Sequence, residues 1–380
     1  MSSSRLVALA AVLGLSVLGV APAAVAAPGN ADFGVAHMPV CPGPPSQVHC
    51  HSDVVTDRSG KPMASSSPTG LSPTRIRNAY GWGSIGSGAG QTIAIVDAYD
   101  DPTAVNDFAV FSNTYGLTGG SLTKVNQRGV HGSYPTANAG WALEISLDIE
   151  WAHAIAPQAA ILLVEADSNS FANLMIAEDY ARAHAGYVSN SWGGSEFAGE
   201  ATYDSHFSGA NVFVSAGDSG LPAEYPSASP KVISVGGTTL HFDANKNFTS
   251  ETGWSNGGGG CSTQETAIPE QSTFATYGQV NCAGRRATPD VALDADPASG
   301  VSVYDSTRYQ GQKGWFSVGG TSASSPMWAG RAAASAASIT PASIYTGTVS
   351  FRDITSGNNG APCLSGYDLV TGRGSWTGSA

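Results

Sequence analysis

The sequence predicts an α/β fold, with a parallel central sheet and helices on both of its faces. Over the body of the chain, apolar runs typical of strands alternate with segments of helical length. Such alternation predicts βαβ units, whose crossover helices cover both faces of a parallel sheet. In folds of this kind, functional groups lie at the carboxyl ends of the strands.

The elements of this body are predicted in chain order. Residues 91–98 form an apolar run after a Gly-rich turn, and a helix over 102–115 begins with Pro102. A second helix, over 170–185, ends before Gly186. Further strands are expected at 160–165, 187–191, 211–215 and 231–235.

The first 73 residues differ from the body in composition. Residues 1–27 are typical of a signal peptide, with Arg5, an apolar run over 6–20 and a small-residue cleavage site at 24–26. Residues 28–73 are rich in Pro, Gly and Ser and show little periodicity. We predict a short pro-peptide or N-terminal extension there, and a folded domain over 74–380.

Charged residues are sparse, and acidic ones dominate. Lys and Arg number 17 against 29 Asp and Glu, which gives a formal net charge of −12. Charged residues make up 12% of the chain, against about 25% in an average soluble domain. This balance argues against a nucleic-acid partner, and no run after the signal is long enough to span a membrane. We therefore expect a secreted, extracellular monomer.

The five cysteines suit an oxidising compartment. Pairing of nearest neighbours joins Cys41 to Cys50 and Cys261 to Cys282, which leaves Cys363 free.

Residues 318–326, Val-Gly-Gly-Thr-Ser-Ala-Ser-Ser-Pro, are the first candidate for chemistry. They lead into an Ala-rich run with high helix propensity, so Ser322 is expected at a helix N-terminus. Unpaired backbone N–H groups and the helix dipole at such a position can stabilise an oxyanion. Because Ser is also a common N-cap, the position alone does not decide its role.

Residues 141–156 are the second candidate. Their middle alternates apolar and polar residues as a strand does, but the stretch between Gly140 and Pro157 is longer than a usual strand, so we predict a helix. On a helix, Glu144 and Asp148 have Cβ atoms about 6 Å apart and can share a proton. On a strand they would be roughly 13 Å apart. Two carboxyls in contact cannot both ionise easily, so one pKa rises.

Asp218, in Ser-Ala-Gly-Asp-Ser-Gly just after strand 211–215, is the third candidate. An Asp at this place can simply cap the turn. If it is buried and protonated, it can instead donate a hydrogen bond to a developing oxyanion.

Taken together, Glu-x-x-x-Asp on a helix, Ser-Ala-Gly-Asp-Ser-Gly and Gly-Thr-Ser-x-x-x-Pro resemble the sedolisin (serine-carboxyl peptidase) family over about residues 73–375. The resemblance implies a subtilisin-like fold in which Ser322 is the nucleophile and Glu144 its general base. It also implies that Asp148 orients Glu144 and that Asp218 supplies the oxyanion hole.

Three further stretches take part in the resemblance. Asp97 and Trp192 resemble outer members of the family's hydrogen-bond network, and residues 191–194 would offer backbone to a bound peptide as an added strand. The C-terminal end is similar to the family's calcium loop, and calcium is bound by oxygen atoms. The resemblance implies one structural Ca²⁺, held by the side chains of Asp353 and Asp368 and the carbonyls of Ile354, Leu364 and Gly366.

The sequence therefore leads to a secreted, acid-active serine-carboxyl endopeptidase that acts on proteins or peptides. An acidic optimum is expected because a carboxylate base works best where its conjugate acid is still accessible. Two alternatives stay open. One is a subtilisin-type triad of Asp97, His131 and Ser322, and the other is a non-catalytic relative that serves as a binding protein.

Overall fold

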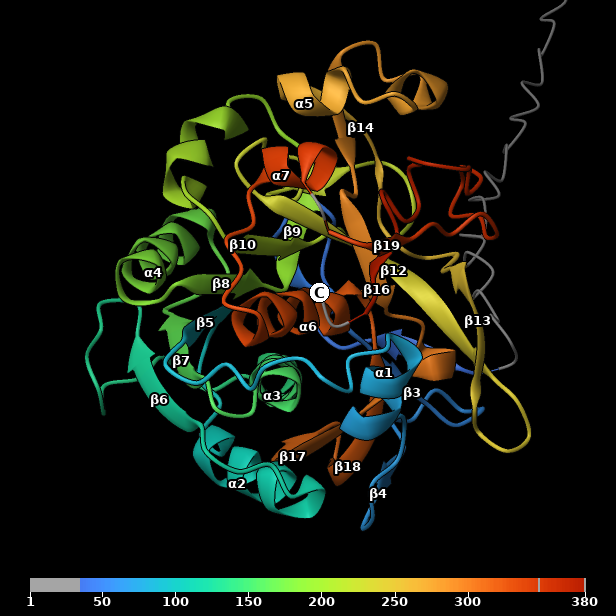
Figure 1. Cartoon of the computed structure of the whole chain (residues 1–380). Helices are drawn as coiled ribbons and strands as arrows, with labels where there is room; N and C mark the ends of the chain where they lie inside the picture. The colour runs from blue at the N-terminus through green and yellow to red at the C-terminus, as the bar shows by residue number, and fades with distance from the viewer. Residues whose placement is uncertain (1–34, 348, 379–380) are drawn as a thin grey trace, which may run out of the picture. The chain divides into compact units, whose positions relative to one another are not determined.

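The computed structural model describes residues 35–347 and 349–378, so the predicted signal peptide, 1–27, lies outside the described residues. A central sheet runs in the order β13-β12-β10-β8-β5-β7-β6, with β16 beside β12 (Figure 1). Its strands pair in parallel, except for β12 with β13. The predicted parallel sheet is confirmed. Its strands are β5 (Thr92–Ala98), β6 (Ser121–Asn126), β7 (Ala160–Ala166), β8 (Tyr187–Asn190), β10 (Val212–Ser215), β12 (Ile233–Phe242), β13 (Phe248–Gly253) and β16 (Val291–Asp294).

Helices cover both faces of this sheet, as predicted (Figure 1). On one face, α3 (Ala139–Ile155) packs against α2 (Ala104–Tyr115) and α6 (Thr321–Ala334). On the other face, α4 (Phe171–His184) packs against β5, β7 and β8. Shorter helices are α1 (Pro73–Ala79), α5 (Pro269–Ser272) and α7 (Pro341–Thr346).

Helix α3 is buried on all sides, which explains its misleading alternating sequence. Every residue from Trp141 to Ile155 is buried, so this helix needs no polar face and has no amphipathic period. Asn138 caps its start by accepting hydrogen bonds from the backbone N–H groups of Gly140 and Trp141. The helix predicted over 141–156 is therefore confirmed, and the strand alternative is excluded.

The Ala-rich sequence of α6 allows it to lie close to α3. At Gly330, an added Cβ would lie 2.9 Å from both the Ala152 carbonyl oxygen and the Ile155 Cβ. Small residues on α6 therefore bring the two helix backbones together, and Figure 1 shows the two helices adjacent at the centre of the fold. This contact sets the distance between groups on α3 and the start of α6.

The residues before α1 are built into the body. Strands β1 (His37–Pro39) and β3 (Asp53–Val55) pair with each other, and β3 pairs with β18 (Gln312–Gly319). Strand β2 (His49–Cys50) pairs with β9 (Trp192–Ser195). Strands β1, β2 and β3 have two or three residues each, which is too few for a periodic signal in the sequence.

The remaining strands lie outside the central sheet. They are β4 (Ala64–Ser65), β11 (Glu224–Tyr225), β14 (Gly260–Thr266), β15 (Arg285–Thr288), β17 (Val301–Tyr309), β19 (Phe351–Arg352) and β20 (Ser375–Trp376).

Both predicted disulfides are present, Cys41–Cys50 and Cys261–Cys282, and Cys363 is a buried free thiol.

Candidate active site

Ser322 lies in the first turn of α6, at the centre of the molecule. Gly320 precedes the helix with φ 98°, a left-handed conformation that favours glycine. The Ser322 hydroxyl donates to the carbonyl oxygen of Ser191 at 3.2 Å. Its backbone N–H, one of the helix's unpaired donors, points to the carbonyl oxygen of His51 at 2.8 Å. Ser322 therefore combines a hydroxyl with a backbone N–H that holds a peptide carbonyl oxygen.

Glu144 and Asp148 lie on the side of α3 that faces this turn. Both side chains are fully buried, and none of their four carboxyl oxygens has a hydrogen-bond partner at standard geometry in the described structure. Burial raises the pKa of Glu144 to about 8, and the nearby hydroxyls of Ser322 and Ser52 only partly oppose this. A proton therefore stays on Glu144 well above the ordinary range of a carboxyl group.

Asp148 and Asp97 extend the same cluster away from Ser322. Burial raises the pKa of Asp148 well above its ordinary value, with added repulsion from Asp97 and Glu144. Asp97, at the end of β5, has its pKa raised by burial and then by Glu144 and Glu165. No cationic side chain contributes to the pKa shifts of these three acids. The cluster is therefore a set of carboxyls that share protons rather than an ion-pair network.

Asp218 lies after β10, on the opposite side of Ser322. Its Oδ1 accepts hydrogen bonds from the Thr321 backbone N–H at 2.7 Å and from the Thr321 hydroxyl at 2.8 Å. Its buried Oδ2 has no partner at standard geometry within the described residues. Burial, and then the nearby Asp53, raise the pKa of Asp218 well above its ordinary value. Asp218 is thus held as a carboxylic acid whose second oxygen can act as a donor.

The second Asp218 oxygen and the His51 carbonyl oxygen meet at Gly320. A Cβ built on Gly320 would lie 2.5 Å from Asp218 Oδ2 and 2.2 Å from the His51 oxygen. The His51 carbonyl oxygen therefore accepts from the Ser322 N–H and lies on the same side of Gly320 as the Asp218 carboxyl, two groups of the kind that stabilise an oxyanion. Only glycine fits at position 320.

Residues 37–55, which we term the covering segment, form a loop closed by the Cys41–Cys50 disulfide and by the pairing of β1 with β3, and its second half, 49–55, runs across Ser322 in extended form. Before the His51–Ser52 bond, β2 pairs antiparallel with β9, and the His51 N–H donates to the Ser191 carbonyl at 3.1 Å. After the bond, β3 pairs antiparallel with β18, with Asp53 opposite Gly319. The backbone that the sequence assigned to a bound peptide, 191–194, is therefore paired with the chain's own N-terminal residues.

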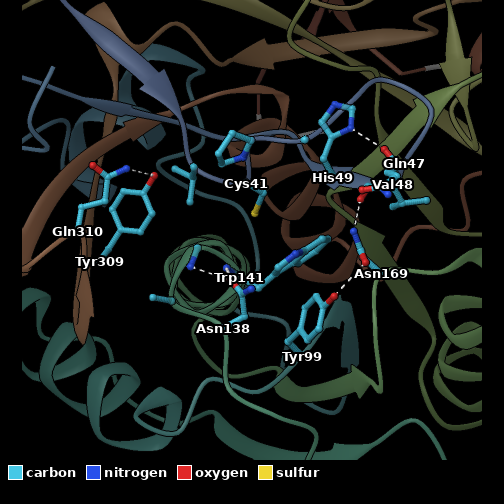
Figure 2. Close-up of a pocket in the computed structure, with 15 residues that line it drawn as sticks. Cys41, Gln47, Val48, His49, Tyr99, Asn138, Trp141, Asn169, Tyr309 and Gln310 are labelled. Carbon is cyan, nitrogen blue, oxygen red and sulfur yellow. Dashed lines mark hydrogen bonds between the residues drawn. The ribbon is translucent and has the colours of Figure 1, made fainter.

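A cavity of about 450 Å³ remains between the covering segment and the body (Figure 2). One wall comes from residues 40–43 and 47–49, and the other includes Tyr99, Trp141 and Tyr309. Figure 2 shows Asn169 reaching across to the backbone of Val48, a hydrogen bond of 2.5 Å. The covering segment thus bridges part of a cleft that continues beneath it.

Other residues singled out in the sequence lie in different settings. Trp192 is buried, and its indole N–H donates to the Val96 carbonyl at 2.8 Å, which ties β9 to β5. His131 is exposed, with its ring beside Tyr134. Within the described residues, the imidazole of His131 has no hydrogen bond to Ser322 or Asp97, so the alternative subtilisin-type triad lacks its contacts.

In the loop compared with a calcium site, the Asp353 and Asp368 carboxylates hold neighbouring backbone N–H groups. The Asp353 carboxylate accepts the Gly366 N–H at 3.0 Å, and Asp368 accepts the Leu364 N–H at 2.9 Å. Both carboxylates thus bind the same turn, 364–366. The set of two carboxylates and the carbonyls of Ile354, Leu364 and Gly366 offers only oxygen atoms, which fits Ca²⁺.

Sequence reasoning missed His51, Ser52 and Asp53 as neighbours of Ser322. Their contacts with β9 and β18 are mainly backbone hydrogen bonds, which any residue except proline can make. The available signal was the Cys41–Cys50 disulfide, because two paired cysteines indicate a structured loop rather than a free tail.

Comparison with known proteins agrees with this geometry. The model of the family described as "Subtilase family" matches residues 88–348. Kumamolisin from Bacillus sp. (strain MN-32) is 30% identical over 359 residues, which cover 82% of this chain and 63% of kumamolisin. Sedolisin from Pseudomonas sp. (strain 101) is 25% identical over 371 residues, which cover 83% of this chain and 61% of sedolisin.

A solved structure is also similar. Pseudomonas sedolisin, a serine-carboxyl proteinase complexed with two molecules of pseudo-iodotyrostatin, matches with a TM-score of 0.70 and 25% identity. The match covers 82% of this chain and 96% of that one. The fold is therefore subtilisin-like, as expected. The chain belongs to the subtilase family, in its sedolisin branch.

The chain spans less than two thirds of the length of the curated relatives just described. Between residues 35 and 378, no helix that the structure describes has both the length and the apolar character needed to cross a membrane.

Proposed function

We propose that this chain is a secreted, acid-active serine-carboxyl endopeptidase whose substrates are proteins or peptides. The observation that carries the proposal is the placement of a peptide carbonyl, that of His51, against the Ser322 N–H and beside the Asp218 carboxyl. A substrate carbonyl held in this way is set for attack by the Ser322 hydroxyl.

The proposed mechanism is acyl transfer. In the state in which Glu144 and Asp148 share a single proton, the Ser322 hydroxyl attacks the scissile carbonyl carbon while its proton passes to Glu144 and the shared proton moves to Asp148. The Ser322 N–H and protonated Asp218 donate to the oxyanion. Glu144 then returns the proton to the leaving amine, and a water molecule hydrolyses the acyl-enzyme.

The covering segment makes this chain its own first substrate in our proposal. Ser322 faces the His51–Ser52 bond, and the Ser52 hydroxyl lies near Glu144. Strand pairing on both sides of the bond reproduces the way in which an extended peptide adds to a sheet edge. We therefore place a processing site between His51 and Ser52, inside an N-terminal extension at 28–73 that follows a signal peptide at 1–27. The peptidase domain is 74–380.

A structural calcium ion is part of the same proposal. The side chains of Asp353 and Asp368, with the carbonyls of Ile354, Leu364 and Gly366, would hold it. Bound there, the ion would fix the loop between β19 and β20. It takes no part in the chemical steps.

The test compares the full chain with its Ser322→Ala variant after transfer from neutral pH to about pH 4. The expected result is a new N-terminus at Ser52 followed by hydrolysis of a peptide library, both absent in Ser322→Ala, which keeps the same circular dichroism spectrum. Turnover by Ser322→Ala would remove Ser322 from the mechanism. A folded wild type without proteolysis at any pH would favour the binding-protein alternative.

The pH profile tests the acids. Raising the pH removes the proton from Asp218, so an acceptor replaces a donor and the rate falls towards neutral pH. Asp218→Asn donates without titrating, and we expect it to keep part of the activity with a weaker loss on the alkaline side. A wild-type optimum above about pH 8, where even the Glu144 carboxyl with its raised pKa is ionised, would contradict the mechanism. Loss of activity in His131→Ala alone would favour the subtilisin-type triad.

A further inference from the structure

Three side chains that the proposed chemistry does not use converge beside the covering segment. His49 begins β2, His51 directly follows its last residue, and Glu224 belongs to β11 on the far side of β9. One potential ligand atom from each of the three lies within 4.8 Å of the others. Side chains from two strands that do not pair with each other are thus brought to one point.

Gly193 makes this convergence possible. Strand β9 lies between β2 and β11, and in its register Gly193 pairs with His49 and Ser195 with Glu224. A Cβ on Gly193 would lie 2.7 Å from His51 Cε1 and 3.1 Å from His51 Nε2. The imidazole of His51 therefore occupies the space that a side chain on β9 would fill, and it crosses the strand to reach Glu224.

Hydrogen bonds orient both imidazoles towards the carboxylate. His49 Nδ1 lies 3.0 Å from the carbonyl oxygen of Gln47, which can only accept, so in the neutral ring Nδ1 carries the proton. His51 Nδ1 lies 2.7 Å from the Ser215 hydroxyl. The Nε2 atoms are therefore the ligand atoms. One ring nitrogen fixed by a hydrogen bond and the other free is the usual arrangement of a metal-bound histidine.

The donor types and the distance between His51 and Glu224 suit a zinc ion. His51 Nε2 and Glu224 Oε2 are 3.0 Å apart, and their side chains are 1% and 13% exposed. Histidine and carboxylate ligands each lie about 2.1 Å from zinc, which puts two ligands of a tetrahedral ion about 3.4 Å apart. The observed pair needs to open by only a few tenths of an ångström. The ligand set of two histidines and one glutamate is known for zinc.

A fourth position can be filled from solvent. His49 and Glu224 line a cavity of about 450 Å³ whose other walls include Pro39, Cys41 and Pro222. Water in this cavity would complete the tetrahedron without any further protein ligand.

We propose that His49, His51 and Glu224 bind one Zn²⁺ ion, which clamps the covering segment onto the body. The regulatory part rests on the proposed function, because the clamp holds the His51–Ser52 bond at Ser322. Both histidines precede that bond, so after cleavage the same ion holds the N-terminal fragment in the groove. Zinc is therefore an inhibitor of substrate entry, and its removal releases the fragment.

Metal binding is tested first, without any need for activity. The full chain carrying Ser322→Ala, which prevents self-cleavage, is titrated calorimetrically with Zn²⁺ near pH 7 in excess Ca²⁺. A separate, metal-free sample is titrated with Co²⁺ as a spectroscopic substitute for zinc. We expect one site and visible absorption bands typical of tetrahedral cobalt. His49→Gln and Glu224→Gln, each added to this background, should weaken binding by about 100-fold or more, whereas His131→Gln, at an exposed histidine elsewhere, should not change it.

Equal zinc affinity in all four proteins, or cobalt spectra without tetrahedral bands, would overturn the site. Circular dichroism checks the fold of each variant. Because His49 and Glu224 lie on different strands, one variant still tests the site if the other misfolds. In active wild type, Zn²⁺ should retain the fragment that ends at His51 during gel filtration, and a chelator should release it. Zinc binding without any self-cleavage would contradict the proposed function alone, whereas self-cleavage without zinc binding would contradict the clamp alone.

Discussion

Two fully buried carboxyl sites in this molecule have opposite surroundings. Asp290 faces Arg286, and its carboxylate accepts both terminal guanidinium nitrogens, one of them at 2.6 Å, together with the Ser234 N–H at 2.8 Å. Neither side chain of this pair is exposed to solvent. Glu144 is equally buried, yet neither of its oxygens has a hydrogen-bond partner at standard geometry in the described part of the chain.

The comparison shows that burial alone does not decide what an acid does. A buried carboxylate with a cation and several donors stays charged and fixes the surrounding loops. Without a cation, the same burial favours the neutral form, so the group keeps a proton that it can exchange. We therefore expect Asp290 to stabilise the folded state and Glu144 to transfer protons in the proposed reaction.

The largest expected effect is that of Glu144→Gln on activity. Loss of the group that moves the proton should lower kcat/KM by about 10⁴-fold, with the fold unchanged at acidic pH. The matched control is Glu178→Gln on α4. Glu178 is also buried without a partner at standard geometry, and burial raises its pKa to about 8. Peptide hydrolysis at acidic pH measures both, and equal losses would show that buried acids matter here only for the fold.

Asp290→Asn should lower the stability of the fold, whereas Glu144→Gln lowers activity. It leaves the Arg286 guanidinium buried without its counter-charge, which should lower the free energy of unfolding by about 3–5 kcal/mol. Urea denaturation near pH 5 measures this loss. Adding Arg286→Met should restore part of the stability, because it removes the unpaired charge. If Asp290→Asn is as stable as wild type, the contrast between the two sites fails.

The pH dependence of stability tests the unpaired acids as a group. The pKa of Glu144 is raised to about 8, and burial raises the pKa values of Asp97, Asp148 and Asp218 as well. In the folded state these groups bind protons that the unfolded chain releases near pH 4. The contribution of Glu144 to stability is therefore complete below about pH 4 and is lost as the pH rises through about 8, and the contributions of the three aspartates are lost in the same direction.

The melting temperature of Ser322→Ala, which avoids self-digestion, should therefore fall between pH 4 and 8. Glu144→Gln in the same background should make the fall less steep, because the amide does not ionise. A melting temperature that rises over this range would mean that the buried acids are not protonated in the folded state.

The smallest effect is expected at Asp97. This residue lies at the outer end of the cluster and influences Ser322 only through Asp148 and Glu144. Asp97→Asn should lower kcat/KM by about tenfold, equivalent to about 1.4 kcal/mol. Steady-state kinetics of Asp97→Asn and Glu144→Gln, measured side by side, show which variant loses more kcat/KM. A greater loss from Asp97→Asn than from Glu144→Gln would favour the subtilisin-type triad.

Local features of the sequence were enough to predict the core of the candidate site. The length of the stretch between Gly140 and Pro157 favoured a helix over a strand, and a helix places Glu144 next to Asp148 through its own geometry. The Ser322 segment likewise combines a glycine-rich turn with an Ala-rich helix. These predictions depend on residues near one another in the chain, where spacing controls distance.

What the sequence by itself determined is therefore the α/β alternation, the helix that carries Glu144 and Asp148, the helix start at Ser322 and the two disulfides. Only the tertiary structure placed the His51–Ser52 bond at Ser322 and joined His51 to Glu224 across Gly193. The reason is physical. The covering segment is held by backbone hydrogen bonds to β9 and β18, which depend little on side-chain identity. The His51 imidazole reaches Glu224 across β9 because Gly193 has no side chain, and a glycine in the sequence does not show which group fills the space beside it.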